Sequence, residues 1–262
     1  MDRNTEIDFL QDVKNHIEHM DKSDGSVQMI SGLLKLVEEK DSKIKETTEA
    51  LKDIKEELSK LKKDMEEIEK DARRDGLTGI NNIKARLPYF EEQFNALSDP
   101  TKEAPDTLYI VAIDLDHFKS INDVYGHDAG DDALRIVARE MESSFRSKDL
   151  VVREGGDEFV IISKNCPLPT LKFKLEQMAN NITNKVNGAL DAHRRVVGGD
   201  EVNIVRPHNY TVSYGINEID LSKLNSELLK NPKEFKDWYD EQKRPADAAS
   251  MEMKAEHHAV RK

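Results

Sequence analysis

The chain has 262 residues, which is enough for one full domain and an extension, and 35% of the residues are charged. Its mean hydropathy of −0.71 is low for a globular protein and indicates that part of the chain forms solvated helix. The net charge of −12 argues against a non-specific nucleic-acid binder, because such proteins need a basic surface to displace counterions from phosphates.

Two features predict a soluble, cytoplasmic protein. Cys166 is the only cysteine, so no disulfide can form within the chain, and a reducing compartment is expected. The N-terminus lacks an apolar segment of signal-peptide type, and the longest central apolar run, residues 108–113, is too short to cross a bilayer. We therefore expect the protein to bind neither a membrane nor a nucleic acid.

Residues 1–26 predict a short amphipathic helix followed by a turn. Apolar residues recur at helical spacing between positions 7 and 20, and Gly25 with its short polar neighbours then favours a turn. His16 and His19 lie at helical spacing and are compatible with zinc binding, although two exposed histidines on a polar helix more often have no such role.

Residues 27–70 predict a coiled-coil stalk. The seam positions, at alternating steps of four and three, are Leu33, Val37, Lys40, Ile44, Thr47, Leu51, Ile54, Leu58, Leu61, Met65 and Ile68. This spacing is the 3.5-residue period of a coiled coil, and Lys40 and Thr47 should weaken it locally. One helix cannot bury so narrow a stripe, so the pattern predicts a homodimer, with a solvated single helix as the alternative.

From residue 71 to residue 262 the pattern changes to strands alternating with helices. Apolar, β-rich runs occupy residues 108–113, 150–152, 159–162 and 210–216. Helices are predicted at residues 133–145, 171–190 and 246–260. The second and third runs flank a glycine-rich hairpin (residues 153–159). This order predicts an α/β sandwich, a mixed sheet with flanking helices.

Carboxylates follow the first of these strands and recur in the glycine-rich hairpin. Asp114 and Asp116 come directly after the strand, and Asp157 and Glu158 lie in the hairpin. A carboxylate at the end of a buried strand is costly unless it faces solvent or a cation. Mg²⁺ commonly binds one or two carboxylates together with substrate phosphates. Spacing alone leaves open both a metal site and ordinary turn residues.

Longer motifs resemble the GGDEF family of diguanylate cyclases. The central motifs of the family are matched, in order and separation, by residues 114–131 and 153–159, DLDHFKSINDVYGHDAGD and REGGDEF. Residues 75–79, DGLTG, resemble the motif that joins an N-terminal helix to the catalytic domain. Residues 211–216, TVSYGI, resemble a later core strand. The resemblance implies a nucleotidyl-cyclase fold, similar to a polymerase palm, that condenses two GTP molecules into cyclic di-GMP.

The resemblance also implies roles for single residues. The metal ligands would be Asp114, Asp157 and the backbone carbonyl of Leu115, with Mg²⁺ as the ion and Mn²⁺ as an alternative. The catalytic residues would be Asp157, Lys119 and Glu158, with Asp157 accepting the proton of the attacking 3′-hydroxyl. The substrate-binding residues would be Phe118, Asn122, His127, Asp131 and Lys254, among which Asn122 and Asp131 would contact guanine.

Product feedback and dimerisation follow from the same resemblance. Arg146 and Asp149 match the Arg-x-x-Asp inhibitory site of the family, where a guanidinium and a carboxylate bind cyclic di-GMP. Because one domain holds one GTP, two domains must face each other. A dimeric stalk raises the effective concentration of the second domain.

Some residues depart from the family pattern. The usual Asn-Arg-Arg after the junction motif is Asn82, Ile83 and Lys84, and the Gly and Arg expected after Lys254 are His257 and His258. These departures concern the turnover rate more than the reaction type. Residues 198–202 contain a second Gly-Gly-Asp-Glu run, which lacks the preceding acidic strand motif and is not expected to be a site.

Two alternative functions remain open. A catalytically silent module that binds cyclic di-GMP would share the fold, but it would not need Asp114 and Asp157. A mixed cyclic GMP-AMP synthase would share the chemistry, but Asp131 pairs with guanine N–H donors that adenine cannot match.

Overall fold

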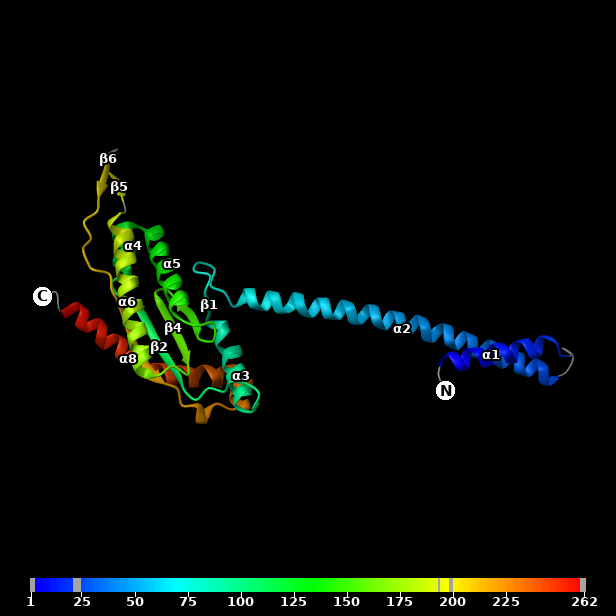
Figure 1. The fold of residues 1–262 in the computed structure, drawn as a ribbon. Coiled ribbons are helices and arrows are strands. Elements are labelled where there is room, and N and C mark those ends of the chain that lie inside the picture. Colours follow the sequence, from blue (N-terminus) through cyan, green and yellow to red (C-terminus); the bar gives the residue numbers. More distant parts are fainter. Residues whose placement is uncertain (1–2, 21–24, 193, 198–199, 260–262) are drawn as a thin grey trace. The chain divides into compact units, whose positions relative to one another are not determined.

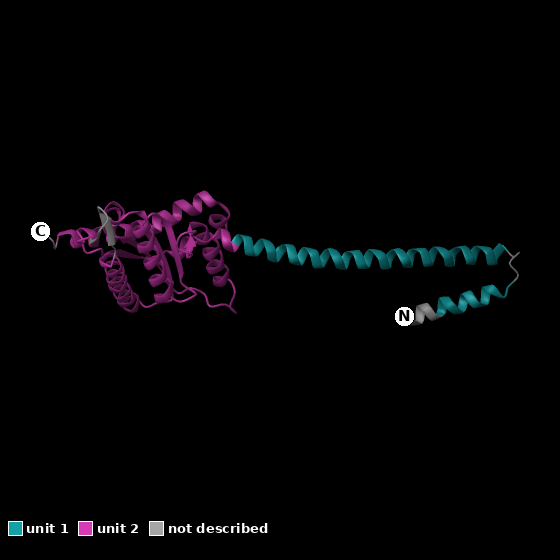
Figure 2. Cartoon of the chain, turned by 90° about the horizontal axis from the view of Figure 1, so that it is seen from above, with its two compact units in different colours: residues 1–69 teal, residues 70–262 magenta. Residues whose placement is uncertain are grey.

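The computed structural model describes residues 3–20, 25–192, 194–197 and 200–259. The chain divides into two compact units, Met1–Glu69 and Lys70–Lys262 (Figure 2). None of the described helices is both long enough and apolar enough to cross a membrane.

The first unit is helical, as its sequence pattern predicts. It contains α1 (Arg3–Glu18) and most of α2 (Gly25–Ala72). Leu10 and Lys14 of α1 line a cavity with Leu34 and Val37 of α2, and Lys14 forms an ion pair with Glu38. Of the turn expected up to residue 26, residues 21–24 lie outside the described residues, and the expectation is wrong for Gly25 and Ser26, which already belong to α2.

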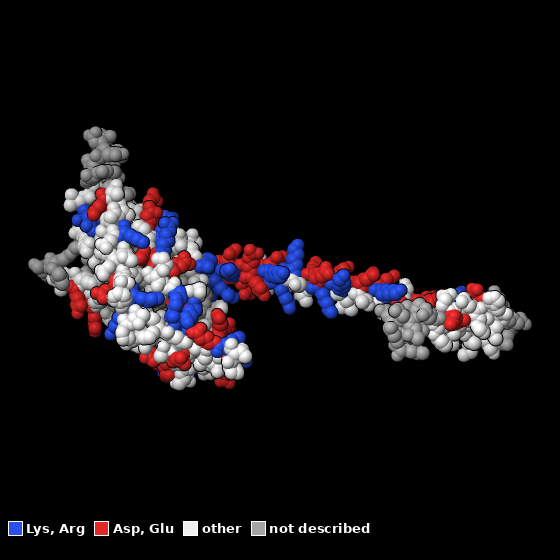
Figure 3. Space-filling view, viewed as in Figure 1, with Lys and Arg blue, Asp and Glu red and all other residues white. Residues whose placement is uncertain are grey.

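The apolar seam of α2 is exposed along its length. The exposed fraction of its apolar residues runs from 40% at Val37 to 68% at Ile68. Acidic and basic side chains cover much of the remaining surface of this helix (Figure 3). The predicted long helix is therefore confirmed, and its pairing with a second copy stays a prediction.

The second unit is built on a five-stranded sheet (Figure 1). Its strand order is β1 (Asn81–Asn82), β3 (Leu150–Gly155), β4 (Glu158–Lys164), β2 (Leu108–Leu115) and β7 (Val212–Glu218). The β1–β3 pair is parallel and the other neighbours are antiparallel, so the predicted mixed sheet is confirmed.

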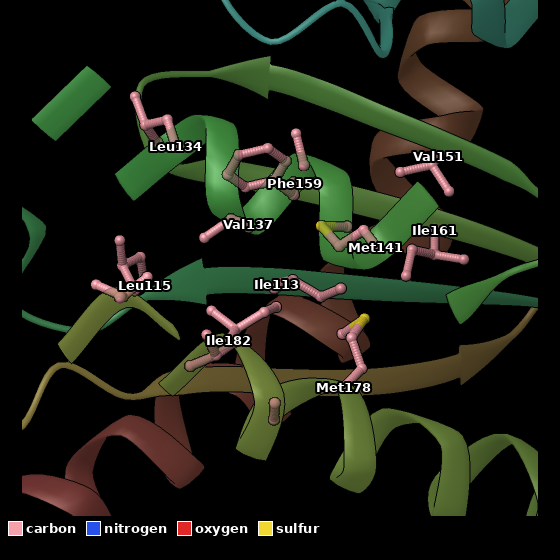
Figure 4. Packing of buried hydrophobic residues seen from close by; sticks show 14 of the residues in the cluster. Ile113, Leu115, Leu134, Val137, Met141, Val151, Phe159, Ile161, Met178 and Ile182 are labelled. Atoms are coloured by element: carbon pink, nitrogen blue, oxygen red, sulfur yellow. The ribbon is translucent and has the colours of Figure 1, made fainter. Parts of the chain in front are cut away.

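Helices cover both faces of the sheet. On the first face lie α4 (Phe118–Tyr125), α5 (His127–Ser144) and α6 (Leu168–Asp191). On the second face lie α3 (Arg86–Leu97), α7 (Ser226–Lys230) and α8 (Pro232–Ala259). Figure 4 shows the first core, with side chains of α5, β2, β4 and α6 in one cluster.

The alternation of side chains along β2 decides on which face the acidic residues lie. Val111 and Ile113 belong to the first core, whereas Ile110 and Ala112 belong to the second. Since successive side chains of a strand point to opposite faces, Asp114 points to the second face, where α8 packs.

Several helices and strands of the structure were not predicted from the sequence pattern. These are α3, α4, α7, two short 3₁₀ helices at Ile83–Ala85 and Leu221–Lys223, and a separate hairpin of β5 (Arg194–Val197) and β6 (Asp200–Asn203). Part of the second Gly-Gly-Asp-Glu run lies in β6, while its residues 198–199 lie outside the described part.

The start of the last helix corrects the sequence-based expectation. α8 begins at Pro232, not at Ala246, and continues through Pro245. Its first half buries Phe235, Trp238 and Tyr239 in the second core. This packing outweighs the hydrogen bond that a proline removes from a helix interior. The predicted end at residue 260 lies outside the described residues.

Candidate active site

Three of the predicted acidic residues meet where β2 ends and the glycine-rich hairpin turns. Asp114 stands opposite Glu158 in the β2–β4 ladder, and Asp157 precedes Glu158 in the turn. Gly156 has a φ of 50°, a left-handed conformation that favours glycine at this tight turn. Asp114 and Glu158 line a cavity of about 240 Å³ against α8.

A lysine of α8 neutralises part of this charge. Lys254 forms an ion pair with Asp114 and lines the same cavity. Burial raises the pKa of Asp114, and the charges of Asp157 and Asp116 add to this effect against the opposing influence of Lys254. Burial alone would lower the pKa of Lys254, but its hydrogen bond and charge interaction with Asp114 raise it. The site is therefore acidic, and a bound cation would balance the charge of its carboxylates.

The donor set fits a divalent ion that is shared with a substrate. Among the described residues, no three histidine, cysteine or acidic side chains form a ready metal site. Asp114 and Asp157 are close enough for their charges to interact. Two carboxylates suit Mg²⁺, which usually keeps several waters or substrate phosphates among its ligands.

Asp116 differs from Asp114, because it is buried and fully engaged with the protein. Its carboxylate accepts hydrogen bonds from Thr211 Oγ1 at 2.5 Å, Ser213 Oγ at 2.8 Å and His257 Nδ1 at 2.8 Å. His257 thus ties the end of α8 to β2 and β7. The ring of its neighbour His258 stacks on His117 at 4.1 Å between ring centres.

The residues expected to contact guanine lie side by side on α4 and α5. Asn122 packs over the first turn of α5, where a Cβ on Gly130 would lie 2.0 Å from Asn122 Oδ1. Gly130 therefore makes room for the Asn122 side chain beside Asp131. Lys119 and His127 are exposed, as substrate contacts need to be. Phe118 is partly buried and packs against the first core, and its contact with substrate stays a prediction.

Arg153 connects the junction motif to the turn of the glycine-rich hairpin. Its Nη1 donates to Asp75 Oδ1 at 2.9 Å, and its Nε and Nη2 donate to the carbonyl of Gly156 at 3.0 and 2.8 Å. Asp75 also accepts hydrogen bonds from the backbone and side chain of Thr78. Both motifs were identified from the sequence, whereas the Arg153–Asp75 hydrogen bond between them was not predicted.

The expected product site lies at the other end of the β3–β4 ladder. The side chain of Asp149 is 0% exposed, and its carboxylate accepts hydrogen bonds from the Arg146 guanidinium and from the backbone N–H of Lys164. Arg146 also donates to the Lys164 carbonyl at 2.7 Å, while its own side chain is 40% exposed. Asp149 therefore faces the protein, and Arg146 is the exposed member of the pair.

Comparison with known proteins places this geometry in a family. Residues 72–221 match the family model of the diguanylate cyclase GGDEF domain. The chain is 40% identical over 94 residues to the probable diguanylate cyclase DgcC of Escherichia coli. The matched stretch covers 36% of this chain and 24% of DgcC. It is 41% identical over 92 residues to the cyclic di-GMP phosphodiesterase NbdA of Pseudomonas aeruginosa, which covers 35% of this chain and 11% of that protein.

A solved structure matches over nearly the whole chain. The diguanylate cyclase SiaD of Pseudomonas aeruginosa, crystallised in complex with its activator SiaC, superposes with a TM-score of 0.54 at 25% identity. The match covers 97% of this chain and 85% of the SiaD chain. By contrast, the matched stretches span less than a quarter of DgcC and NbdA. The family match covers more than half of the sequence, and the chain therefore belongs to the GGDEF-domain family of diguanylate cyclases.

Proposed function

We propose that the protein condenses two GTP molecules into cyclic di-GMP. The observation that carries this proposal is the acidic pair Asp114 and Asp157, which lies at the hairpin and is balanced by Lys254. A domain that only binds the product has no need for two neighbouring carboxylates at a place where burial, together with the charge of Asp157, raises the pKa of Asp114. Asn122 and Asp131, which would form the guanine pocket with Gly130 leaving room for the Asn122 side chain, support guanine as the base.

The proposed reaction is an in-line attack of one 3′-hydroxyl on the α-phosphate of the facing GTP. Asp157 accepts the hydroxyl proton, the 3′-oxygen bonds to phosphorus, and pyrophosphate leaves. The same step with the roles of the two nucleotides exchanged closes the ring and releases the second pyrophosphate. Asp114, Asp157 and the Leu115 carbonyl would bind Mg²⁺, which, when bound, polarises the phosphoryl oxygens. Lys254 would move from Asp114 to the triphosphate, and exposed Lys119 would add positive charge there. Positioning of the two nucleotides supplies much of the remaining rate enhancement.

Turnover of GTP tests this function directly. We expect the purified chain with GTP and Mg²⁺ to release cyclic di-GMP and pyrophosphate, and Asp157→Ala to abolish release because it removes a metal ligand and the proton acceptor. Asp200→Ala is the matched control, since Asp200 is the equivalent residue of the second Gly-Gly-Asp-Glu run. Product would be identified by chromatography and mass spectrometry. Binding of cyclic di-GMP without any turnover would favour the silent module instead.

The guanine pocket generates a second prediction. Gly130→Ala places a methyl group on Asn122 Oδ1 and should weaken GTP binding about 10- to 100-fold, the equivalent of about 1.5–3 kcal/mol for hydrogen bonds to a charged group. Helical propensity should not fall, because alanine is the better helix former. Gly188→Ala on α6 is the control, since a Cβ there meets no described atom within 4 Å. Equal GTP affinity in calorimetry for the two variants would contradict the assigned pocket.

We propose that product feedback acts through Arg146, whose guanidinium is held in place by its ion pair with the buried Asp149. Arg146→Ala should relieve inhibition by added cyclic di-GMP and weaken its binding at least about 10-fold, because charge-assisted hydrogen bonds are lost. Arg139→Ala, at an exposed position on α5, is the control for lost surface charge. Inhibition curves at fixed GTP measure the effect. An inhibition constant that is the same in wild type and Arg146→Ala would remove Arg146 from the product site.

The exposed seam of α2 supports a homodimer. Apolar residues that are 40–68% exposed along one helix leave a stripe that a second copy would cover. Each apolar seam side chain contributes up to about 1.5–3 kcal/mol if it is fully covered. The stalk would thereby bring two GTP-loaded domains together.

Leu58→Glu tests the stalk. Two such charges would meet in an apolar seam at a cost of a few kcal/mol each, so the dimer should dissociate and specific activity should fall on dilution. Ser59→Glu adds the same charge next to the seam and should leave the dimer intact. Sedimentation and GTP turnover over one dilution series measure both effects. A monomeric Leu58→Glu protein with full activity at low concentration would refute the role of the stalk.

A further inference from the structure

A buried ionic cluster lies beneath the glycine-rich hairpin. The carboxylate of Glu154 accepts hydrogen bonds from Arg86 Nη1 of α3 at 2.9 Å, and from Tyr239 Oη and Lys243 Nζ of α8 at 3.0 and 2.6 Å. The side chains of Glu154, Arg86 and Lys243 are only 11, 15 and 13% exposed. The Arg86 guanidinium also lies 4.3 Å from the centre of the Tyr239 ring. We call these four residues the Glu154 cluster.

The cluster acts on the strand immediately before the metal-binding turn. The β3–β4 register shifts between Arg153 and Gly155, so Glu154 lies at a bulge. Bulges change the direction of a strand and re-aim the side chains that follow. Asp157 comes three residues later. Arg153 connects this turn to Asp75 in the junction motif, while Glu154 connects it to α3 and α8.

A buried ionic cluster is an inefficient way to stabilise a fold. Taking its charges out of water costs much of what their attraction returns, and apolar residues of similar volume often stabilise as well or better. Its distinctive property is directional, because a guanidinium, a phenol and an ammonium fix the position of one carboxylate from three sides. Lys243 also lines the cavity that contains Asp114 and Lys254.

We propose that Arg86, Tyr239 and Lys243 are positioning residues, which act through Glu154 to hold the hairpin turn and Asp157 in the geometry required for metal-dependent catalysis. This proposal rests on the proposed cyclase function. A displacement of about 1 Å at a reacting group reduces rates about 100-fold, so a loosened bulge should lower kcat more than it raises KM. The guanine pocket on α4 and α5 is built from other elements, which is why GTP affinity should change little.

Lys243→Met in the intact 262-residue chain tests the proposal, because it keeps roughly the length of the side chain and removes the charge. We expect kcat for cyclic di-GMP formation to fall about 10- to 100-fold while KM for GTP stays within about threefold. Lys236→Met is the matched control, since Lys236 forms an exposed ion pair with Asp240 on the same helix, and it should behave as wild type. An unchanged kcat in Lys243→Met would overturn the proposal.

The urea midpoint of Lys243→Met separates positioning from folding stability. This variant leaves the Arg86–Glu154 ion pair in place, so no buried charge loses its last partner and the urea midpoint should stay close to that of Lys236→Met, whereas kcat should fall because Glu154 is no longer fixed from three sides. If the urea midpoint fell together with kcat, the cluster would be purely structural and the proposal would fail.

Hydrogen exchange provides a readout that does not depend on turnover. Amides of residues 154–158 should exchange faster in Lys243→Met than in wild type and Lys236→Met, while those of α5 should be unchanged. A wild-type protein without any cyclase activity would refute the proposed function and with it the kinetic expectation. Normal exchange in the hairpin of Lys243→Met would instead refute the positioning role by itself.

Discussion

The partial burial of neighbouring carboxylates at the end of β2 is the constraint on which the rest of the domain depends. Burial and the charges of Asp157 and Asp116 raise the pKa of Asp114, so the group is costly to ionise where the fold puts it. Asp116 is satisfied internally by Thr211, Ser213 and His257. Asp114 instead forms an ion pair with Lys254, whose side chain is 33% exposed. The proposed function requires such a partner, because Lys254 would give up Asp114 to a metal ion.

α8 supplies the counterions, and it can do so because it lies very close to the sheet. A Cβ on Gly215 of β7 would lie 2.0 Å from the carbonyl of Ala246, so this glycine permits the approach. Lys243, Lys254 and His257 then follow one another along the helix toward Glu154, Asp114 and Asp116, respectively. One helix thus provides partners for three acidic residues, because Lys254 pairs with Asp114 in β2, Lys243 pairs with Glu154 at the bulge of β3, and His257 hydrogen-bonds to Asp116 directly after β2.

The sequence predicts this arrangement wherever a local pattern carries the information. The strand around residues 108–113, the glycine-rich hairpin and the acidic residues were identifiable because strand periodicity and the family motifs are local. The sequence pattern does not predict the first half of α8, because Phe235, Trp238 and Tyr239 lie among charged residues before Pro245. These three side chains stabilise the helix only through their packing in the second core. The sequence also does not predict that Asp149 points inward or that the Glu154 cluster forms. Asp149 accepts from the backbone N–H of Lys164, and Glu154 pairs with Arg86, which is far from it in the sequence. His257, which departs from the family pattern, has a structural role in this chain, because it hydrogen-bonds to the buried Asp116.

We propose that Asp114 exchanges Lys254 for a metal ion, which Asp157 also binds, when GTP binds. Anomalous diffraction from crystals grown with Mn²⁺ and a GTP analogue that cannot be cleaved at the α-phosphate measures this directly. We expect an anomalous peak bonded to a carboxylate oxygen of both Asp114 and Asp157, with Lys254 moved onto the triphosphate. Bound nucleotide with Lys254 still on Asp114, and an anomalous peak away from both carboxylates, would contradict it.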